Sequence, residues 1–130
     1  MSVGIVLVSH SANLAEAAAE LARELAGPST PVLAAGGTED GRFGTSIDKL
    51  EVAVADADSG DGVAILMDVG SAVLTSKALL AELGDDDPDV RLVDAPLVEG
   101  AIAAAVTAST GQGLDAVIAA AEEARGMRKL

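Results

Sequence analysis

The sequence contains no cysteine, tryptophan or tyrosine, and His10 and Phe43 are its only histidine and its only phenylalanine. The absence of cysteine excludes disulfide bonds, thiol catalysis and cysteine-based zinc sites. No run of 18 apolar residues occurs, and no basic segment precedes the short apolar stretch near the start. We therefore expect a cytoplasmic protein that does not insert into a membrane.

Basic residues are also scarce. The sequence has 8 Lys and Arg residues and 21 Asp and Glu residues, which gives a formal net charge of -13. Binding to nucleic acid requires clustered cations that contact phosphates, and binding to anionic membrane surfaces requires the same, so both are excluded as functions. An acidic surface suits a partner protein with a basic patch. The alternative, that the charge serves only solubility, stays open.

Short apolar runs alternate with helical patterns along the 130 residues, which we interpret as a single domain spanning residues 1–130. The runs at 3–8, 31–35, 63–67 and 90–93 are typical of buried strands. Strands that alternate with helices predict an α/β fold with a mostly parallel open sheet of about four strands and helices on both faces. Because alanine is abundant and aromatics are nearly absent, we expect a core of small aliphatic side chains.

Two helix starts carry capping residues. Ser11 or Asn13 can cap the first helix, and Thr45 with Asp48 resembles a capping box for the second. In the first helix, apolar residues at helical spacing predict the buried side: Leu14, Ala17, Ala18, Leu21, Ala22 and Leu25.

His10 directly follows the first predicted strand, between two serines. In open parallel sheets, chemistry collects at the carboxyl ends of the strands, and neutral imidazole is a good nucleophile at physiological pH. Asp68 follows the third strand in the same way. If those two strands are neighbours, Asp68 faces His10, and a carboxylate bonded to one ring nitrogen leaves the other nitrogen free to attack. The sequence thus predicts a phosphoryl-accepting or acid/base histidine oriented by Asp68.

The helix starts at Ser11, Ser46 and Ser71 offer N–H groups and hydroxyls to a phosphoryl group. Plainer interpretations remain: Asp68 and Ser71 as helix caps, and the glycines as turn residues. The glycine-rich loop at 36–38 lacks the lysine of a nucleotide-binding loop, and the aspartates of residues 56–62 lack calcium-loop spacing. We therefore expect neither a metal nor a cofactor. No basic residue accompanies His10, which fits a partner that brings its own cations.

Five segments resemble the mannose-class enzyme IIA family, and within it most closely the phosphotransferase subunit of the phosphoenolpyruvate-dependent dihydroxyacetone kinase. The resemblance spans nearly the whole chain and rests on the segments Val8-Ser9-His10-Ser11, Ala34-Ala35-Gly36-Gly37, Gly44-Thr45-Ser46, Met67-Asp68-Val69-Gly70-Ser71-Ala72 and Ala95-Pro96-Leu97-Val98-Glu99-Gly100-Ala101. Ser11 after the histidine and the single Gly70 favour the dihydroxyacetone branch over the sugar-transport branch.

This resemblance implies a phosphotransferase that works through a phosphohistidine. His10 accepts a phosphoryl group from the carrier HPr and passes it to ADP on one kinase subunit, and a third subunit binds dihydroxyacetone; the chain itself forms a homodimer. Catalysis is assigned to His10 and Asp68. Phosphate or partner binding is assigned to Ser9, Ser11, Gly36, Gly37, Thr38, Thr45, Gly70 and Ser71.

Two alternative functions stay open: the IIA component of a mannose-class sugar-uptake system, and a non-catalytic regulatory module in which His10 only binds a ligand. A receiver-like domain phosphorylated on Asp68 is disfavoured, because Ser9-His10-Ser11 stands where such domains need an acidic pair for magnesium. A phosphatase of the phosphoglycerate-mutase type would need a second histidine and an adjacent arginine, which the sequence lacks.

Overall fold

A four-stranded parallel sheet forms the centre of the computed structural model, which describes residues 2–130. Its strands are β1 (Gly4–Ser9), β2 (Val32–Gly36), β3 (Val63–Met67) and β4 (Val90–Val93), in the order β2-β1-β3-β4. All three neighbouring pairs are parallel. The predicted α/β fold class is confirmed, and each predicted strand lies within one residue of the observed one.

The strand order brings together the residues that follow β1 and β3. The chain moves outward from β1 to β2 on one side and to β3 and β4 on the other, so β1 and β3 flank the point where the direction of winding reverses. Val8 is in register with Met67, and the amide of Asp68 donates to the carbonyl of Val8 at 3.0 Å. The residues that follow these two strands, His10 and Asp68, therefore leave the sheet side by side.

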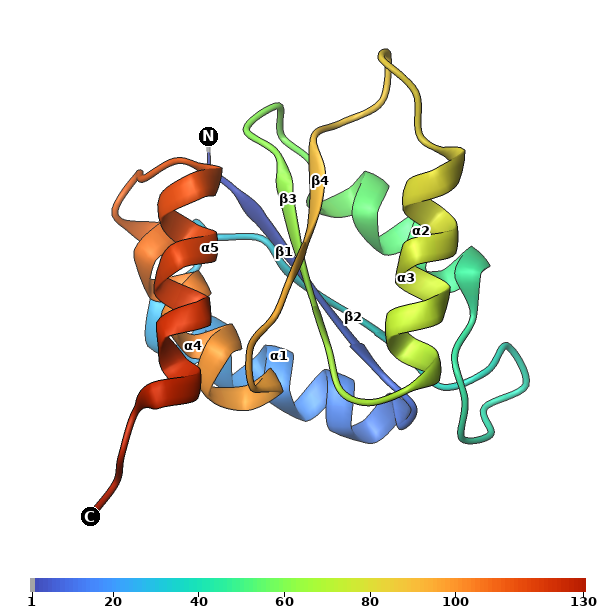
Figure 1. Cartoon of the computed structure of the whole chain (residues 1–130), viewed down its shortest axis with the longest axis horizontal. Coiled ribbons are helices and arrows are strands. Elements are labelled where there is room, and N and C mark those ends of the chain that lie inside the picture. Colours follow the sequence, from blue (N-terminus) through green and yellow to red (C-terminus); the bar gives the residue numbers. More distant parts are fainter. Residues whose placement is uncertain (1) are drawn as a thin grey trace.

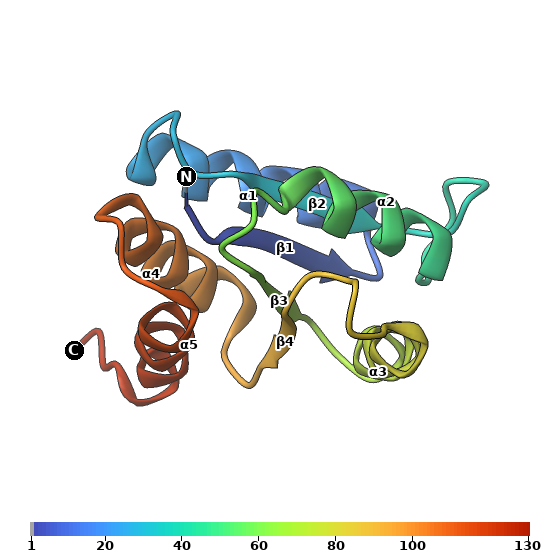
Figure 2. The same ribbon diagram turned by 90° about the horizontal axis from the view of Figure 1, so that it is seen from above.

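Residues 2–130 form five α-helices, and Figures 1 and 2 show helices on both faces of the sheet. The core on one face is formed with α1 (Ala12–Ala26), α4 (Leu97–Ser109) and α5 (Leu114–Glu123), and a short 3-10 turn (Ala124–Gly126) follows α5. The core on the other face is formed with α2 (Ile47–Ala57) and α3 (Ser71–Glu82). Among residues 2–130, no helix is long and apolar enough to cross a membrane.

The core is built from small and aliphatic side chains, as the composition predicts. Valine, isoleucine and leucine fill the strands, and alanine covers most of the buried helix surface. The predicted buried face of α1 is wrong in part. Its buried residues are Ala15, Ala18, Ala19 and Ala22, whereas the predicted Leu14, Ala17, Leu21 and Leu25 are exposed. Alanines let α1 lie close to β2 and α4, and leucines at those positions would hold the helix away from them.

The second helix begins one residue later than the sequence pattern predicts. Ser46 is the N-cap of α2, and its hydroxyl accepts a hydrogen bond from the amide of Lys49. The Thr45 hydroxyl instead pairs with that of Thr75 on α3 at 2.7 Å. This pair ties the loop after β2 to the helix that follows β3.

Candidate active site at the carboxyl ends of β1 and β3

His10 lies at the carboxyl end of β1 with 29% of its side chain exposed. Its Nδ1 is 2.9 Å from Oδ1 of Asp68, which follows β3, so the predicted contact is present. The ring is thus held by the protein on one edge and open to solvent on part of its surface. This is the placement that a group must have if it reacts with a second protein.

The carboxylate of Asp68 is held by four donors from two strand ends. Oδ2 accepts from the Ser9 hydroxyl at 2.8 Å and from the His10 main-chain amide at 3.0 Å. Oδ1 accepts from the Val69 amide at 2.7 Å and faces His10 Nδ1. Partial burial is the largest influence on the pKa of Asp68 and raises it, but these hydrogen bonds together outweigh burial and lower the pKa below its usual value. Asp68 is therefore an anion in neutral solution.

An ionised Asp68 determines the tautomer of His10. A carboxylate can only accept, so Nδ1 must carry the proton, and Nε2 then carries the lone pair. The hydroxyl of Ser71 lies 2.6 Å from Nε2 and donates to this lone pair. Asp68 and Ser71 therefore hold opposite edges of one imidazole, with Nε2 as its nucleophilic atom.

The turn before α3 positions Ser71. Gly70 is the N-cap of α3 without a side-chain cap bond, and its φ of 33° lies in the region that favours glycine. The interpretation of Asp68 or Ser71 as a cap of this helix is therefore wrong. Among residues 2–130, the amides of Gly70 and Ser71 donate to no protein group, so two N–H groups remain available at the helix start beside the Ser71 hydroxyl.

Ser9 and Ser11 serve the structure of the site. The Ser9 side chain is buried; its hydroxyl accepts from the Ser11 amide at 3.0 Å while it donates to Asp68. Ser11 is the N-cap of α1, and its hydroxyl accepts from the Leu14 amide at 3.1 Å. Ser9 thus connects the start of α1 to the carboxylate that orients His10.

The remaining four predicted residues lie at the end of β2 and in the loop that follows it, and their contacts reach β1, α2 and α3. Gly37 donates from its amide to the carbonyl of Ser9, and Thr45 pairs with Thr75. The Thr38 hydroxyl bonds to Asp40 and accepts from the amide of Arg42. Gly36 accepts from the Lys49 ammonium at 3.1 Å. These contacts brace the wall of the site, and none of them reaches the ring of His10.

Gly36 is required by close packing against α1. A methyl group added there would lie 2.6 Å from the Ser11 carbonyl oxygen and 2.8 Å from both Ala12 Cα and Ala15 Cβ. We expect Gly36→Ala to lower the free energy of unfolding by about 1–3 kcal/mol, because the start of α1 must move. Urea unfolding measures the change. Gly84→Ala is the matched control, because nothing lies within 4 Å of that position; equal effects of the two substitutions would disprove this packing role.

Sequence reasoning predicted residues at both ends of the loop that forms one wall of the site, but it missed Phe43 between them. The amide of Gly44 donates to the carbonyl of His10 at 2.9 Å, and Phe43 beside it is 83% exposed. One signal was available, since a lone aromatic between polar and glycine residues is unusual in a chain with so few aromatics.

Among the residues that the structure describes, no Lys or Arg side chain bonds to His10, Asp68 or Ser71. Arg42, in the same loop, is paired with Asp40 at 2.8 Å, and Lys49 binds the carbonyl of Gly36. Within residues 2–130, no group of three or more His, Asp or Glu side chains is arranged to hold a metal ion. The site as described offers an oriented nucleophile and hydrogen-bond donors.

Comparisons with known proteins agree with this geometry. Residues 4–118, which include His10 and Asp68, match the EIIA-man family, described as the PTS system fructose IIA component. A crystal structure of a protein of unknown function superposes with a TM-score of 0.88 at 37% identity, covering 99% of this chain and 98% of that one.

Several relatives carry functional names. The phosphoryl donor subunit DhaM of PEP-dependent dihydroxyacetone kinase 2 from Listeria innocua is 36% identical over 89% of this chain and 94% of its own length. The corresponding subunit from Escherichia coli is 40% identical over 89% of this chain, but the match covers only 25% of that longer protein. This chain is a member of the EIIA-man family.

Proposed function

We propose that this protein is a phosphohistidine relay subunit of a phosphoenolpyruvate-dependent dihydroxyacetone kinase. His10 accepts a phosphoryl group from the carrier HPr and passes it to ADP bound on a partner kinase subunit. The observation that carries the proposal is the ring of His10 held between Asp68 at Nδ1 and Ser71 at Nε2. The relatives from Listeria innocua and Escherichia coli are named as phosphoryl donor subunits of dihydroxyacetone kinases, which supports dihydroxyacetone as the final phosphoryl acceptor of the system.

The first transfer uses the lone pair on Nε2. As Nε2 bonds to phosphorus, the bond between phosphorus and the donor's histidine nitrogen breaks, and its electron pair returns to the donor ring. The proton on Nδ1 stays in place, and Asp68 stabilises the positive charge that develops on the imidazole of His10. In the second transfer, an oxygen of the ADP β-phosphate bonds to phosphorus, and Nε2 recovers its lone pair.

Ser71 changes partner during this cycle. Its hydroxyl occupies the Nε2 lone pair in the resting state, so it must turn away as the nitrogen–phosphorus bond forms. It then donates to a phosphoryl oxygen, together with the free amides of Gly70 and Ser71. Because no Lys or Arg side chain of residues 2–130 bonds to His10 or Asp68, the remaining charge of the phosphoryl group must be balanced by the partner.

The proposal extends to the partners and the assembly. HPr as the donor, a kinase subunit as the acceptor and a homodimer follow from the family resemblance, and a cytoplasmic location follows from the amino-acid composition. Sedimentation equilibrium tests the homodimer: a single species of 12.8 kDa would exclude it.

A labelling experiment tests the function. The protein is incubated with labelled phosphoenolpyruvate, the first enzyme of the phosphotransferase system and HPr, and is then chased with the ADP-loaded kinase subunit. We expect an acid-labile, base-stable label that leaves as ATP. Label that forms but moves only to a sugar-specific component indicates the sugar-uptake alternative. No label on any residue indicates the non-catalytic module, and an acid-stable, base-labile label indicates an acyl phosphate on Asp68.

Removal of the Ser71 hydroxyl should slow transfer without abolishing it. A hydrogen bond to a charged group contributes about 1.5–3 kcal/mol, so we expect Ser71→Ala to reduce the single-turnover rate by about 10- to 100-fold. Rapid-quench measurement of label transfer from phosphorylated HPr gives this rate. Ser71→Thr keeps the hydroxyl and should restore most of it. Transfer by Ser71→Ala at the unchanged rate would show that the hydroxyl takes no part.

A further inference from the structure

We infer that the hydroxyl pair of Thr45 and Thr75 holds the start of α3 against His10, so that Ser71 stays in place while it changes partner during phosphoryl transfer. The inference rests on the proposed function and adds two positioning residues to it. Neither threonine contacts a reacting atom, because their hydroxyls bond to each other at 2.7 Å. Both act through Ser71.

Thr75 and Ser71 lie on the same side of α3. They are four residues apart, and side chains at that spacing lie one above the other on a helix. The Ser71 hydroxyl is 2.6 Å from Nε2 of His10, and the Thr75 hydroxyl meets Thr45 one turn further along. A hydrogen bond at Thr75 therefore fixes the side of the helix that presents Ser71 to the imidazole.

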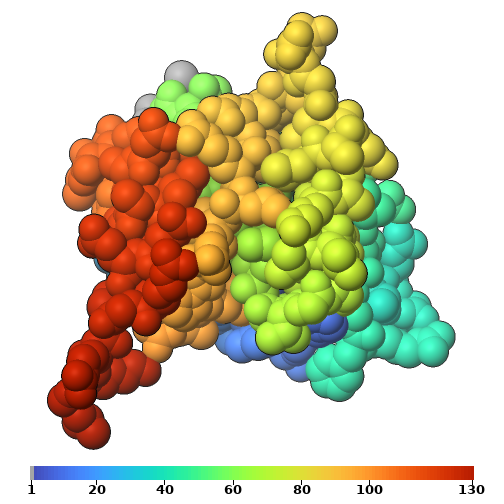
Figure 3. Space-filling view, viewed as in Figure 1, coloured from blue at the N-terminus to red at the C-terminus, as the bar shows by residue number. Residues whose placement is uncertain are grey.

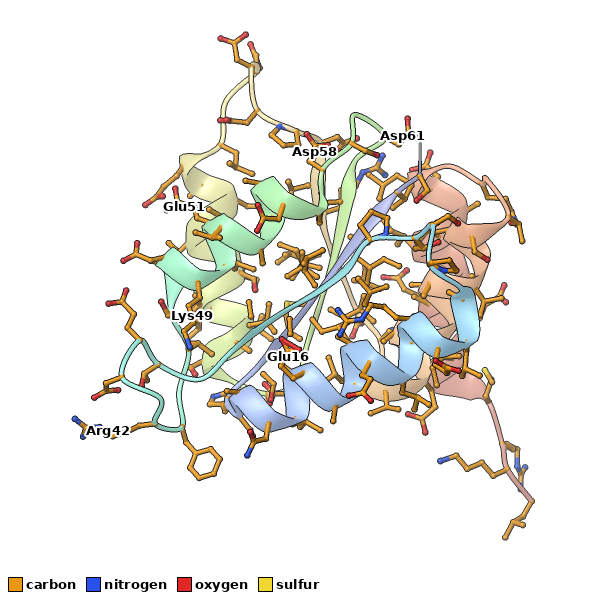
Figure 4. The ribbon with its side chains drawn as sticks, turned by 180° about the vertical axis from the view of Figure 1, so that it is seen from behind. Glu16, Arg42, Lys49, Glu51, Asp58 and Asp61 are labelled. Carbon is orange, nitrogen blue, oxygen red and sulfur yellow. The ribbon has the colours of Figure 1, made fainter. Side chains whose placement is uncertain are left out.

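The segment that carries Thr45 is itself anchored on both sides. The amide of Gly44 donates to the carbonyl of His10 at 2.9 Å, and the Ser46 hydroxyl accepts from the amide of Lys49 at 3.2 Å. Figure 4 shows Lys49 at the base of this loop, at the start of α2. In Figure 3, the teal surface of the loop adjoins the yellow-green surface of α3. Thr45 is thus a fixed point, tied to the end of β1, to which α3 is attached.

The rest of α3 is attached by few groups. Three of its twelve residues are buried, namely Ala72, Ser76 and Leu79, and Figure 2 shows the helix at the margin of the molecule. The Ser76 hydroxyl donates to the carbonyl of Ala72 at 2.7 Å, so this bond stays within the helix. Within residues 2–130, side-chain hydrogen bonds connect α3 to the remainder of the protein only at Ser71 and Thr75.

Transfer breaks one of these two connections. The Ser71 hydroxyl leaves Nε2 of His10 when nitrogen bonds to phosphorus, and it must then find a phosphoryl oxygen. During this exchange, the Thr45–Thr75 pair is the side-chain hydrogen bond that still holds α3. A displacement of about 1 Å in a reacting geometry can slow a reaction by about a hundredfold. Loss of the pair should therefore slow the chemical step and leave partner binding unchanged.

Thr75→Val tests this, because it removes the hydroxyl and keeps the shape of the side chain. We expect the single-turnover rate at saturating phosphorylated HPr to fall by about 3- to 10-fold, which corresponds to the loss of one neutral hydrogen bond, with KM close to that of the wild type. Thr45→Val removes the other hydroxyl and should behave alike. Thr75→Ser keeps the hydroxyl and should restore most of the rate.

Thr107→Val is the matched control, since Thr107 is a half-buried threonine within α4. It should leave the rate unchanged, and urea unfolding should give the same midpoint for Thr75→Val as for this control. Thr75→Val that transfers at the wild-type rate would disprove the inference.

A double-mutant cycle tests whether Thr75 acts through Ser71. In the background of Ser71→Ala, the further change Thr75→Val should alter the single-turnover rate by less than about twofold, because the group that Thr75 positions is already missing. If the two substitutions instead slow transfer independently, so that their factors multiply, Thr75 has only a general structural role and the inference is wrong.

NMR of the unphosphorylated protein gives a readout that needs no transfer. With histidine labelled with ¹⁵N, the Nε2 resonance of His10 reports the hydrogen bond from Ser71. We expect Thr75→Val to move this resonance toward its position in Ser71→Ala, and Thr107→Val to leave it in place. A resonance that Thr75→Val does not move would overturn the positioning role. If the wild-type protein accepts no label from phosphorylated HPr, the proposed function itself fails, whatever the resonances show.

Discussion

Substitution of His10 by alanine is expected to abolish phosphoryl acceptance completely. His10 is the only histidine of the chain, and its Nε2 carries the lone pair that Asp68 and Ser71 orient. No other side chain that contacts it offers a nitrogen nucleophile. Incubation of His10→Ala with labelled phosphoenolpyruvate, the first phosphotransfer enzyme and HPr should give no protein-bound label above background.

The variant should remain folded. The ring makes two side-chain hydrogen bonds, and a typical one contributes about 0.5–1.5 kcal/mol, so we expect a loss of about 1–3 kcal/mol in the free energy of unfolding. Asp68 keeps three of its donors in this variant, which limits the damage. Urea unfolding checks this. Stoichiometric label on folded His10→Ala would move the acceptor to another residue.

Substitution of Asp68 by asparagine is expected to slow transfer by about a hundred- to ten-thousand-fold while the acceptor remains. An amide side chain can donate to Nδ1 and so favour the tautomer with its proton on Nε2, where it blocks attack. It also carries no charge to stabilise the imidazolium. Asn is preferable to Ala here, because four donors converge on this side chain and removal of the whole group would leave them without an acceptor.

Rapid-quench kinetics from phosphorylated HPr separate this effect from partner binding. The loss should appear in the rate at saturating HPr, with a KM close to that of the wild type. Asp61→Asn removes the same charge at the opposite end of the sheet and should transfer normally. If Asp68→Asn reacts at the wild-type rate, the carboxylate only supports the local fold.

The core of the site could be predicted from sequence because it depends on topology. Alternating strands and helices favour a parallel sheet. When helices cover both faces, the direction of winding reverses within the sheet, and this reversal places β1 next to β3. Once those strands are neighbours, the residues that follow them, His10 and Asp68, must meet. The four strands were found for a similar reason, since short β-branched runs leave little choice of secondary structure.

Details that depend on packing and turn geometry could not be predicted in this way. The buried face of α1 is set by how closely the helix approaches the sheet, which favours alanine over the more hydrophobic leucine. The role of Gly36 follows from atoms of α1 that lie far away in sequence. The contact of Ser71 with Nε2 depends on the unusual φ of Gly70, which residue types alone do not reveal.

The position of the phosphoryl group on the imidazole tests the account most directly. The protein is phosphorylated from phosphoenolpyruvate with its histidine labelled with ¹⁵N, and the nitrogen–phosphorus and nitrogen–hydrogen couplings of His10 are measured by NMR. Because Nδ1 holds its proton against Asp68, the account predicts phosphorus on Nε2 only. Phosphorus on Nδ1, or a phosphorylated protein in which the ring of His10 is unmodified, would contradict it.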